Sequence, residues 1–307
     1  DINRDGHQDF MTVDMLSSDH KRRKTQMGMM QPTPTAVGLI HNRPQIMQNT
    51  FFLGRGDNTW AEIAQFAGVK ASEWSWGTVF MDVDLDGYED LLISTGMTRD
   101  FMDSDAMDRI EEEKKQLSEK YKSKPNLAPL VVSFGHHWPK LETTNVAYRN
   151  RGDLTFEDVS KKWGFGTLAV SGGIARADFD GDGFPDVVGS LTGSEEVRWY
   201  RNDNGQNFIQ QPTIATSLVV ESLSTGRFNN DDMTDLVVTS ENGRILWFQS
   251  DGSGGFVALL DDVFHVDRSE ANVIGDGFGC RNAKSVDPRV TNVETDLAVE
   301  ADNLRID

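Results

Sequence analysis

The 307-residue chain has a single cysteine, Cys280. An internal disulfide is therefore excluded, as are zinc and redox sites built from several cysteines. Basic residues are also scarce, since 30 Lys and Arg stand against 49 Asp and Glu and give a formal net charge of −19. That charge disfavours binding to nucleic acid or to an anionic membrane surface, because both require clustered positive charge.

Long hydrophobic runs are missing too, and none approaches the roughly 20 residues of a membrane span. No signal peptide precedes the first residues, Asp1–Gly6, which lie in the middle of a repeated motif. We therefore expect that the N-terminus has been lost or trimmed. Aliphatic and aromatic residues still suffice for a core, so the many carboxylates have a cause other than disorder.

The carboxylates are concentrated in a repeated nine-residue loop. Oxygen-bearing side chains stand at loop positions 1, 3, 5 and 9, with glycine at position 6, in three segments: Asp1–Asp9, Asp82–Asp90 and Asp178–Asp186. A fourth copy, Arg227–Asp235, keeps positions 3, 5 and 9 but has arginine at position 1. A fifth, around 287–296, is recognisable mainly by the apolar run after it.

Two kinds of strand segment accompany the loops. A short apolar run follows each loop, as in Leu91–Thr95 and Leu236–Ser240. A hairpin with aromatic ends also recurs, at Phe51–Trp60, Tyr148–Phe156, Trp199–Phe208 and Trp247–Phe256.

The later copies recur at the 40–50-residue spacing typical of propeller blades. We therefore predict an all-β fold, a β-propeller of four-stranded blades in a partial or complete ring, forming one region over 1–307. The predicted blades are approximately 1–63, 74–160, 171–212, 217–260 and an incomplete 283–307. The wider early spacing predicts insertions at 14–47 and 99–143, the second with a helix near 104–122.

The loop pattern favours a calcium site, because Ca²⁺ takes six to eight oxygen ligands in irregular geometry. An EF-hand would need a glutamate at position 12 and flanking helices, whereas Thr12, Ile93 and Gly189 occupy that position within expected strands. We predict about three Ca²⁺ sites, with the residue at position 7 contributing its carbonyl. We predict no metal in the fourth loop, because Arg227 can place its own charge there. The predicted ligands are Asp1, Asn3, Asp5, His7, Asp9, Asp82, Asp84, Asp86, Tyr88, Asp90, Asp178, Asp180, Asp182, Phe184 and Asp186.

These motifs resemble the FG-GAP or VCBS-type repeat proteins, whose blades carry D-x-D-x-D-G-x-x-D loops and Y-R-N-x-G-D-x-T-F hairpins. Tyr148–Phe156 fits the hairpin closely, and Asp14–Leu16, Gln48–Thr50 and Trp74–Gly77 look like the bacterial branch that carries ASPIC and UnbV domains. The resemblance implies export, a calcium-stabilised propeller, and roles in adhesion, recognition or surface assembly, as in integrin α heads. Such propellers usually have seven blades. The chain is therefore either a piece of a longer protein, which we favour, or a ring that closes with fewer blades.

We expect a binding, adhesion or structural module that lies outside the cell, at its surface or in the periplasm. Its partner would be a protein, a glycan or further copies of itself. No catalytic residue is predicted, and no nucleophile elbow, P-loop or dinucleotide fingerprint occurs. The alternative is a polysaccharide lyase or hydrolase, with His136, His137 and Lys140 as candidates. We expect the two adjacent histidines to diverge along an extended segment of an exposed loop.

Overall fold

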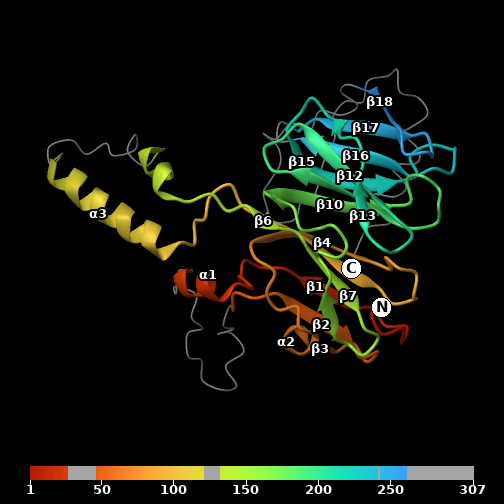
Figure 1. Ribbon diagram of the computed structural model, residues 1–307, viewed down its shortest axis with the longest axis horizontal. Helices are drawn as coiled ribbons and strands as arrows, with labels where there is room; N and C mark the ends of the chain where they lie inside the picture. The colour runs from red at the N-terminus through yellow and green to blue at the C-terminus, as the bar shows by residue number, and fades with distance from the viewer. Residues whose placement is uncertain (27–45, 121–131, 241–242, 261–307) are drawn as a thin grey trace. The chain divides into compact units, whose positions relative to one another are not determined.

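The computed structural model describes residues 1–26, 46–120, 132–240 and 243–260 (Figure 1). The chain divides into two compact units, with the boundary between Gly172 and Gly173. The predicted fifth loop and incomplete blade, 283–307, lie outside the described residues, as does much of the predicted insertion 14–47.

The elements of the first unit are mainly short strands. They are β1 (Phe10–Thr12), α1 (His20–Thr25), β2 (Thr50–Gly54), β3 (Trp60–Glu62), α2 (Ala64–Ala67), β4 (Ser75–Met81), β5 (Asp90–Thr95), α3 (Ser104–Lys120), η2 (Val132–His137), β6 (Thr143–Thr144), β7 (Val146–Asn150), β8 (Phe156–Asp158) and β9 (Leu168–Ala169).

The remaining elements are all strands. They are β10 (Ser171–Ala177), β11 (Asp186–Leu191), β12 (Glu196–Asn202), β13 (Phe208–Gln210), β14 (Ile214–Ala215), β15 (Val220–Gly226), β16 (Asp235–Ser240), β17 (Ile245–Ser250) and β18 (Phe256–Leu260).

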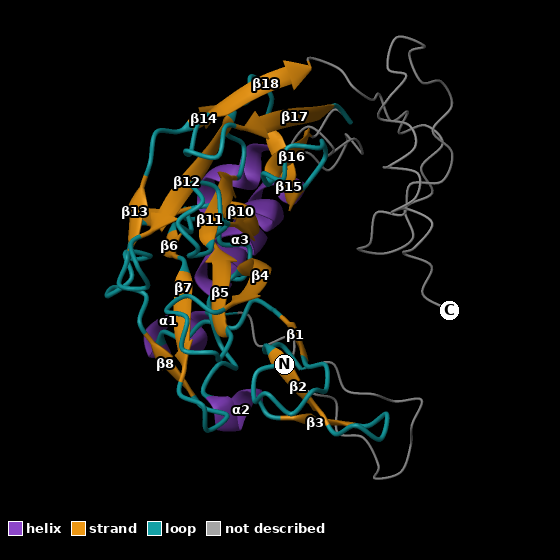
Figure 2. Ribbon diagram, turned by 90° about the vertical axis from the view of Figure 1, so that its right-hand side faces the viewer, coloured by secondary structure: helices purple, strands orange, loops and turns teal. Residues whose placement is uncertain are grey.

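Antiparallel sheets of successive strands make up both units (Figure 2). The first unit holds a three-stranded sheet in the order β1-β2-β3, a four-stranded sheet in the order β4-β5-β7-β8, and the small pair β6-β9. The second holds the sheets β10-β11-β12-β13 and β15-β16-β17-β18, with β14 added to β12. The predicted all-β class with four-stranded, propeller-like sheets is therefore confirmed.

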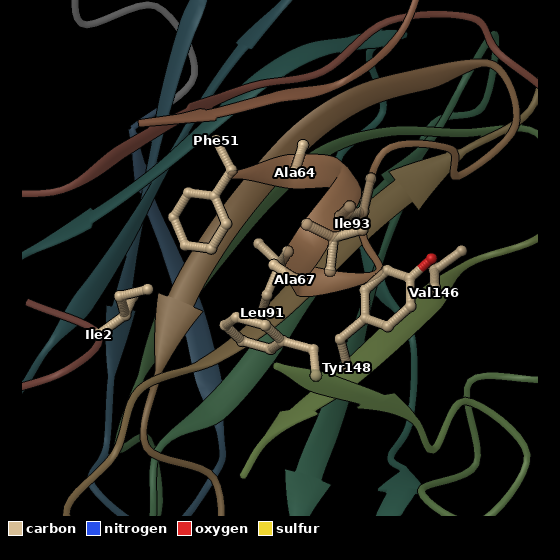
Figure 3. Packing of buried hydrophobic residues seen from close by; sticks show 10 residues of the cluster. Ile2, Phe51, Ala64, Ala67, Leu91, Ile93, Val146 and Tyr148 are labelled. Atoms are coloured by element: carbon tan, nitrogen blue, oxygen red, sulfur yellow. The ribbon is translucent and has the colours of Figure 1, made fainter. Parts of the chain in front are cut away.

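The core of the first unit joins the three-stranded sheet to its four-stranded neighbour (Figure 3). Phe51 on β2 is fully buried, and its ring lies 5.7 Å from that of Phe156 on β8. Leu91 and Ile93 of the apolar run in β5 are fully buried as well. Tyr148 brings a hydroxyl into this core and donates it to the carbonyl of Ala71 at 3.2 Å, so the buried polar group is satisfied.

The core of the second unit uses the aromatic ends of the repeated hairpins. Phe179, which follows the first residue of its loop, packs edge-on against Trp199 and Phe256, with ring centroids 6.4 and 5.2 Å away. Aliphatic residues of β11 and β16 complete the cluster. The repeat phasing of these aromatics thus reflects packing within the sheets and between them.

The predicted helical insertion is confirmed as α3, which begins at Ser104 and ends at Lys120. The return of the chain forms the short 3-10 helix η2, which contacts α3. Among the described residues, no helix combines the length and the apolar character needed to cross a membrane.

Candidate metal-binding loops

The second and third predicted loops each lie between two strands of a sheet, and the first loop directly precedes β1. All three are held by the side chain at their first position. In the second loop, Asp82 accepts the backbone N–H groups of Asp86 at 3.0 Å and Gly87 at 2.8 Å. Asp1 accepts the corresponding groups of Asp5 and Gly6 at 3.0 and 2.8 Å. The carboxylate at position 1 therefore fixes the tight turn through hydrogen bonds to the backbone, which do not require a metal ion.

The glycine at position 6 is required by the backbone of that turn. Gly6, Gly87 and Gly183 have φ values of 83°, 89° and 89°, a region that residues with a side chain adopt only with strain. The fourth loop has Asp232 at this position with a φ of 61°, in the left-handed region that aspartate tolerates better than most residues.

The third loop repeats the turn with one change. Asp178 accepts N–H groups from Gly181 at 2.8 Å and Gly183 at 3.0 Å. In all three loops the residue at position 7 donates its N–H to the carboxylate at position 5. These pairs are His7 with Asp5, Tyr88 with Asp86, and Phe184 with Asp182, at 2.8, 3.0 and 2.8 Å.

In the second and third loops, the turn gathers acidic side chains. Carboxylate oxygens of Asp82, Asp84 and Asp86 lie within 4.8 Å of one another, so these residues could hold a metal ion. One oxygen of this group, Asp84 Oδ1, is buried and lacks a hydrogen-bond partner among the described residues. A buried acceptor without a partner is costly, and a cation would satisfy it. The donor set, entirely oxygen, fits a hard cation.

The third loop gathers Asp178, Asp180 and Asp186 within the same 4.8 Å limit. Asp182 lies beside this group, with Oδ2 3.9 Å from Arg201 Nη1. Sequence reasoning placed all four residues in one cage, and the described geometry brings three of them together.

The first loop has fewer charges, because its third position is an asparagine. Asn3 donates from Nδ2 to Asp5 Oδ2 at 2.9 Å, which lowers the pKa of Asp5. Among the residues described here, this loop forms no cluster of three acidic side chains.

Burial and mutual repulsion oppose ionisation of the loop carboxyls. Burial, followed by the nearby charges of Asp84 and Asp86, raises the pKa of Asp90 to about 7. Burial likewise raises the pKa of Asp186 to about 6. A nearby cation would favour the charged form of both groups.

An arginine that the sequence reasoning missed reaches the second loop. Arg149 on β7 donates from Nε to Asp84 Oδ2 at 2.7 Å and from Nη2 to Asp86 Oδ2 at 2.8 Å. Two other third strands also direct a long polar side chain at the loop, since Arg201 is near Asp182 and Gln249 donates to Asp231 Oδ2 at 2.8 Å. The sequence carries a signal for these contacts: each long polar residue directly follows an aromatic residue of its hairpin and precedes a smaller polar residue, as in Tyr148-Arg149-Asn150.

The aspartate at position 9 fastens each loop to the strand that pairs with the one following the loop. Asp90 accepts the N–H of Val83 at 3.0 Å and that of Asn150 on β7 at 2.8 Å. Asp9 does the same with Ile2 at 2.9 Å and Gly54 on β2 at 2.8 Å. Carboxylate oxygens have further lone pairs, so these bonds leave room for a metal.

The fourth loop keeps this fastening. Asp235 is fully buried and accepts Trp247 Nε1–H at 3.1 Å and Ser250 N–H at 3.0 Å. Arg227 points to the surface, where it pairs with Asp232 at 3.5 Å with 65% of its side chain exposed. Among the residues that the structure describes, Arg227 therefore makes no ion pair in the loop interior that would let it replace a cation. The absence of metal from the fourth loop stays a prediction.

A comparison with protein families identifies the repeat. A family model described as FG-GAP-like repeat matches residues 1–93, 131–189 and 178–238. No curated protein matches. Among solved structures, one similar chain comes from work on recognition of non-reducing terminal N-acetylglucosamine by an Agrocybe aegerita lectin, at 15% identity and a TM-score of 0.32. The match covers 71% of this chain and 61% of that one.

The fastening predicts a large effect of Asp235→Asn. The amide cannot accept both N–H groups, so the free energy of unfolding should fall by about 1–3 kcal/mol. Urea denaturation of the full chain measures it. Asp232→Asn in the same loop is the control, because Asp232 is 95% exposed and its surface ion pair contributes little. Equal effects of the two substitutions would contradict a role for the buried carboxylate.

Proposed function

Because the chain belongs to the FG-GAP-like repeat family, we propose that it is a calcium-binding module, extracellular or periplasmic, that serves in binding, adhesion or assembly. The observation that carries the calcium proposal is Asp84 Oδ1, the buried oxygen without a described partner amid three converging carboxylates. Calcium in such a loop would neutralise the clustered negative charge and coordinate the carboxylate oxygens, including the one without a described hydrogen-bond donor.

Asp82, Asp84 and Asp86 would hold one ion, and Asp178, Asp180 and Asp186 another. The other predicted ligands would complete these shells or hold a weaker ion in the first loop. Calcium suits the loops better than magnesium does, because it accepts irregular oxygen geometry and needs fewer retained waters.

Each ion would stabilise the sheets on which a binding surface is built. The second and third loops each join the first two strands of a sheet, and the position-9 aspartate ties them to the third strand. A rigid scaffold of this kind presents its other loops and insertions to a partner. We propose a protein, a glycan or further copies of the chain as that partner, to be separated by capture experiments in calcium and in chelator.

We propose a non-catalytic role. The alternative, a polysaccharide-active enzyme, depends on His136, His137 and Lys140. His137 is paired with Glu113 on α3, and this contact engages the imidazole that would serve as a base. Turnover of acidic polysaccharide that is lost when these three residues are replaced would favour the enzyme instead.

Calcium should raise the melting temperature, because the folded loops bind it and the unfolded chain does not. At calcium 100-fold above the dissociation constant, each occupied loop adds about 2.7 kcal/mol. Asp84→Ala and Asp180→Ala should each remove most of one loop's contribution, as measured by thermal unfolding in calcium and in chelator. Asp108→Ala, an exposed change on α3, should leave the full response. A response that both loop variants retain would refute the proposal.

The calcium response should weaken in acid. Asp90 and Asp186 have pKa values raised to about 7 and about 6, so the folded metal-free protein binds protons more tightly than the unfolded chain does. The stability that these two groups contribute without calcium is fully present below about pH 4 and is lost as pH rises to 7. The calcium-induced shift in melting temperature should therefore be larger at pH 7.5 than at pH 5. A calcium-induced shift in melting temperature that does not change with pH would show that calcium and protons do not compete for these carboxyls.

Arg149 should oppose the ion in the second loop, because its guanidinium contacts two of the three candidate ligands. Arg149→Gln should tighten calcium binding there and lower stability in chelator, as measured by calorimetric titration and thermal unfolding. Arg151→Gln is the control, since Arg151 lies on the same hairpin but pairs with exposed Glu157 at 3.5 Å. Weaker calcium binding in Arg149→Gln would mean that the arginine organises the site.

A further inference from the structure

A third cluster of metal-ligand side chains lies on the helical insertion. It differs from the two clusters in the Asp-rich loops because it contains histidines. It consists of Glu113 on α3 and of His136 and His137 at the end of η2, with one ligand atom from each within 4.8 Å of the others. Figure 1 shows α3 and η2 side by side. The predicted FG-GAP chemistry does not use these residues.

The expectation that the two histidines diverge along an extended segment is wrong. They end the 3-10 helix η2, and their rings lie 4.0 Å apart at an interplanar angle of 38°. His137 Nε2 is in direct contact with the Glu113 carboxylate, whose side chain is 34% exposed. Two imidazoles and one carboxylate therefore converge from residues far apart in the sequence.

The backbone that carries the histidines is positioned without help from a metal. Arg109 on α3 donates from Nη2 to the carbonyl of His137 at 3.3 Å. Lys114 lies 6.0 Å from the ring centroid of Phe134, which is buried within the insertion. These contacts fix η2 against α3, so an ion would need only side-chain adjustment.

We propose that Glu113, His136 and His137 form a site for a divalent transition-metal ion of the zinc class. Imidazole nitrogen suits Zn²⁺, Ni²⁺ and Cu²⁺, whereas calcium is held by oxygen ligands. Two histidines and one glutamate make a known three-residue zinc set that leaves a position for water or another ligand.

The distances permit this set after a small closure. Zinc bonds nitrogen and carboxylate oxygen at about 2.0–2.2 Å, so tetrahedral ligand atoms lie roughly 3.3–3.6 Å apart. The 4.8 Å limit of the present cluster therefore requires a movement of about 1 Å, which side-chain rotation can supply. His137 is 19% exposed and Glu113 is 34% exposed, so neither side chain is locked in a packed core. The ion would replace the His137–Glu113 contact and join η2 to α3.

The test is titration of the full chain with zinc and with cobalt in excess calcium, which keeps the acidic loops occupied. Calorimetry counts the bound zinc, and the visible absorption of cobalt reports nitrogen ligation. The unaltered chain should bind a single zinc ion through this site. The double variant His136→Ala/His137→Ala should lose it, and Glu113→Gln should weaken it at least tenfold.

Two matched controls separate ligation from general charge and from zinc held elsewhere. Glu112→Gln, the exposed neighbour on α3, and His20→Ala, an exposed histidine on α1, should both keep full zinc binding. A circular dichroism spectrum and a melting temperature in chelator that match those of the unaltered chain show that the double variant is folded. No zinc uptake by the unaltered chain, or uptake that survives in the double variant, overturns the proposal. Neither result bears on calcium binding by the loops.

Discussion

The tight turn between the strands brings several carboxylates together, and their mutual repulsion must be offset if the turn and its sheet are to be stable. Asp82, Asp84 and Asp86 converge because the turn needs the first carboxylate to accept two backbone N–H groups. Those N–H groups and Arg149 offset part of the negative charge. The buried oxygen Asp84 Oδ1 is left over, and it marks the place where a cation has most to contribute.

The position-9 aspartate solves a different problem, the attachment of the loop to the rest of its sheet. Asp186 accepts the N–H groups of Phe179 and Asn202 and the indole N–H of Trp199. Asp235 keeps equivalent bonds in a loop that lacks an acidic first position. The ninth residue therefore has a structural role that does not require metal, and a cation at the second or third loop would add to it.

Much of the fold could be predicted, because its signals are local. Spacing of the loops and hairpins, glycine at position 6 and the periodic face of α3 each determine backbone geometry over a few residues. Contacts between segments far apart in the sequence had a less direct signal, the residue after the aromatic in each hairpin. Arg149 meets Asp84 across the sheet, and pattern alone did not distinguish that arginine from a surface residue. The convergence of His136 and His137 depends on the 3-10 helix η2, and the pattern of so short a segment does not predict such a helix.

A crystal structure of the protein, from crystals grown in millimolar calcium, would show whether the second loop binds the ion. We predict a calcium ion bound by Asp82, Asp84 and Asp86, with Asp84 Oδ1 among its ligands and bond lengths of about 2.3–2.6 Å. Ordered water in that place, with the Arg149 guanidinium still bridging Asp84 and Asp86, would contradict it.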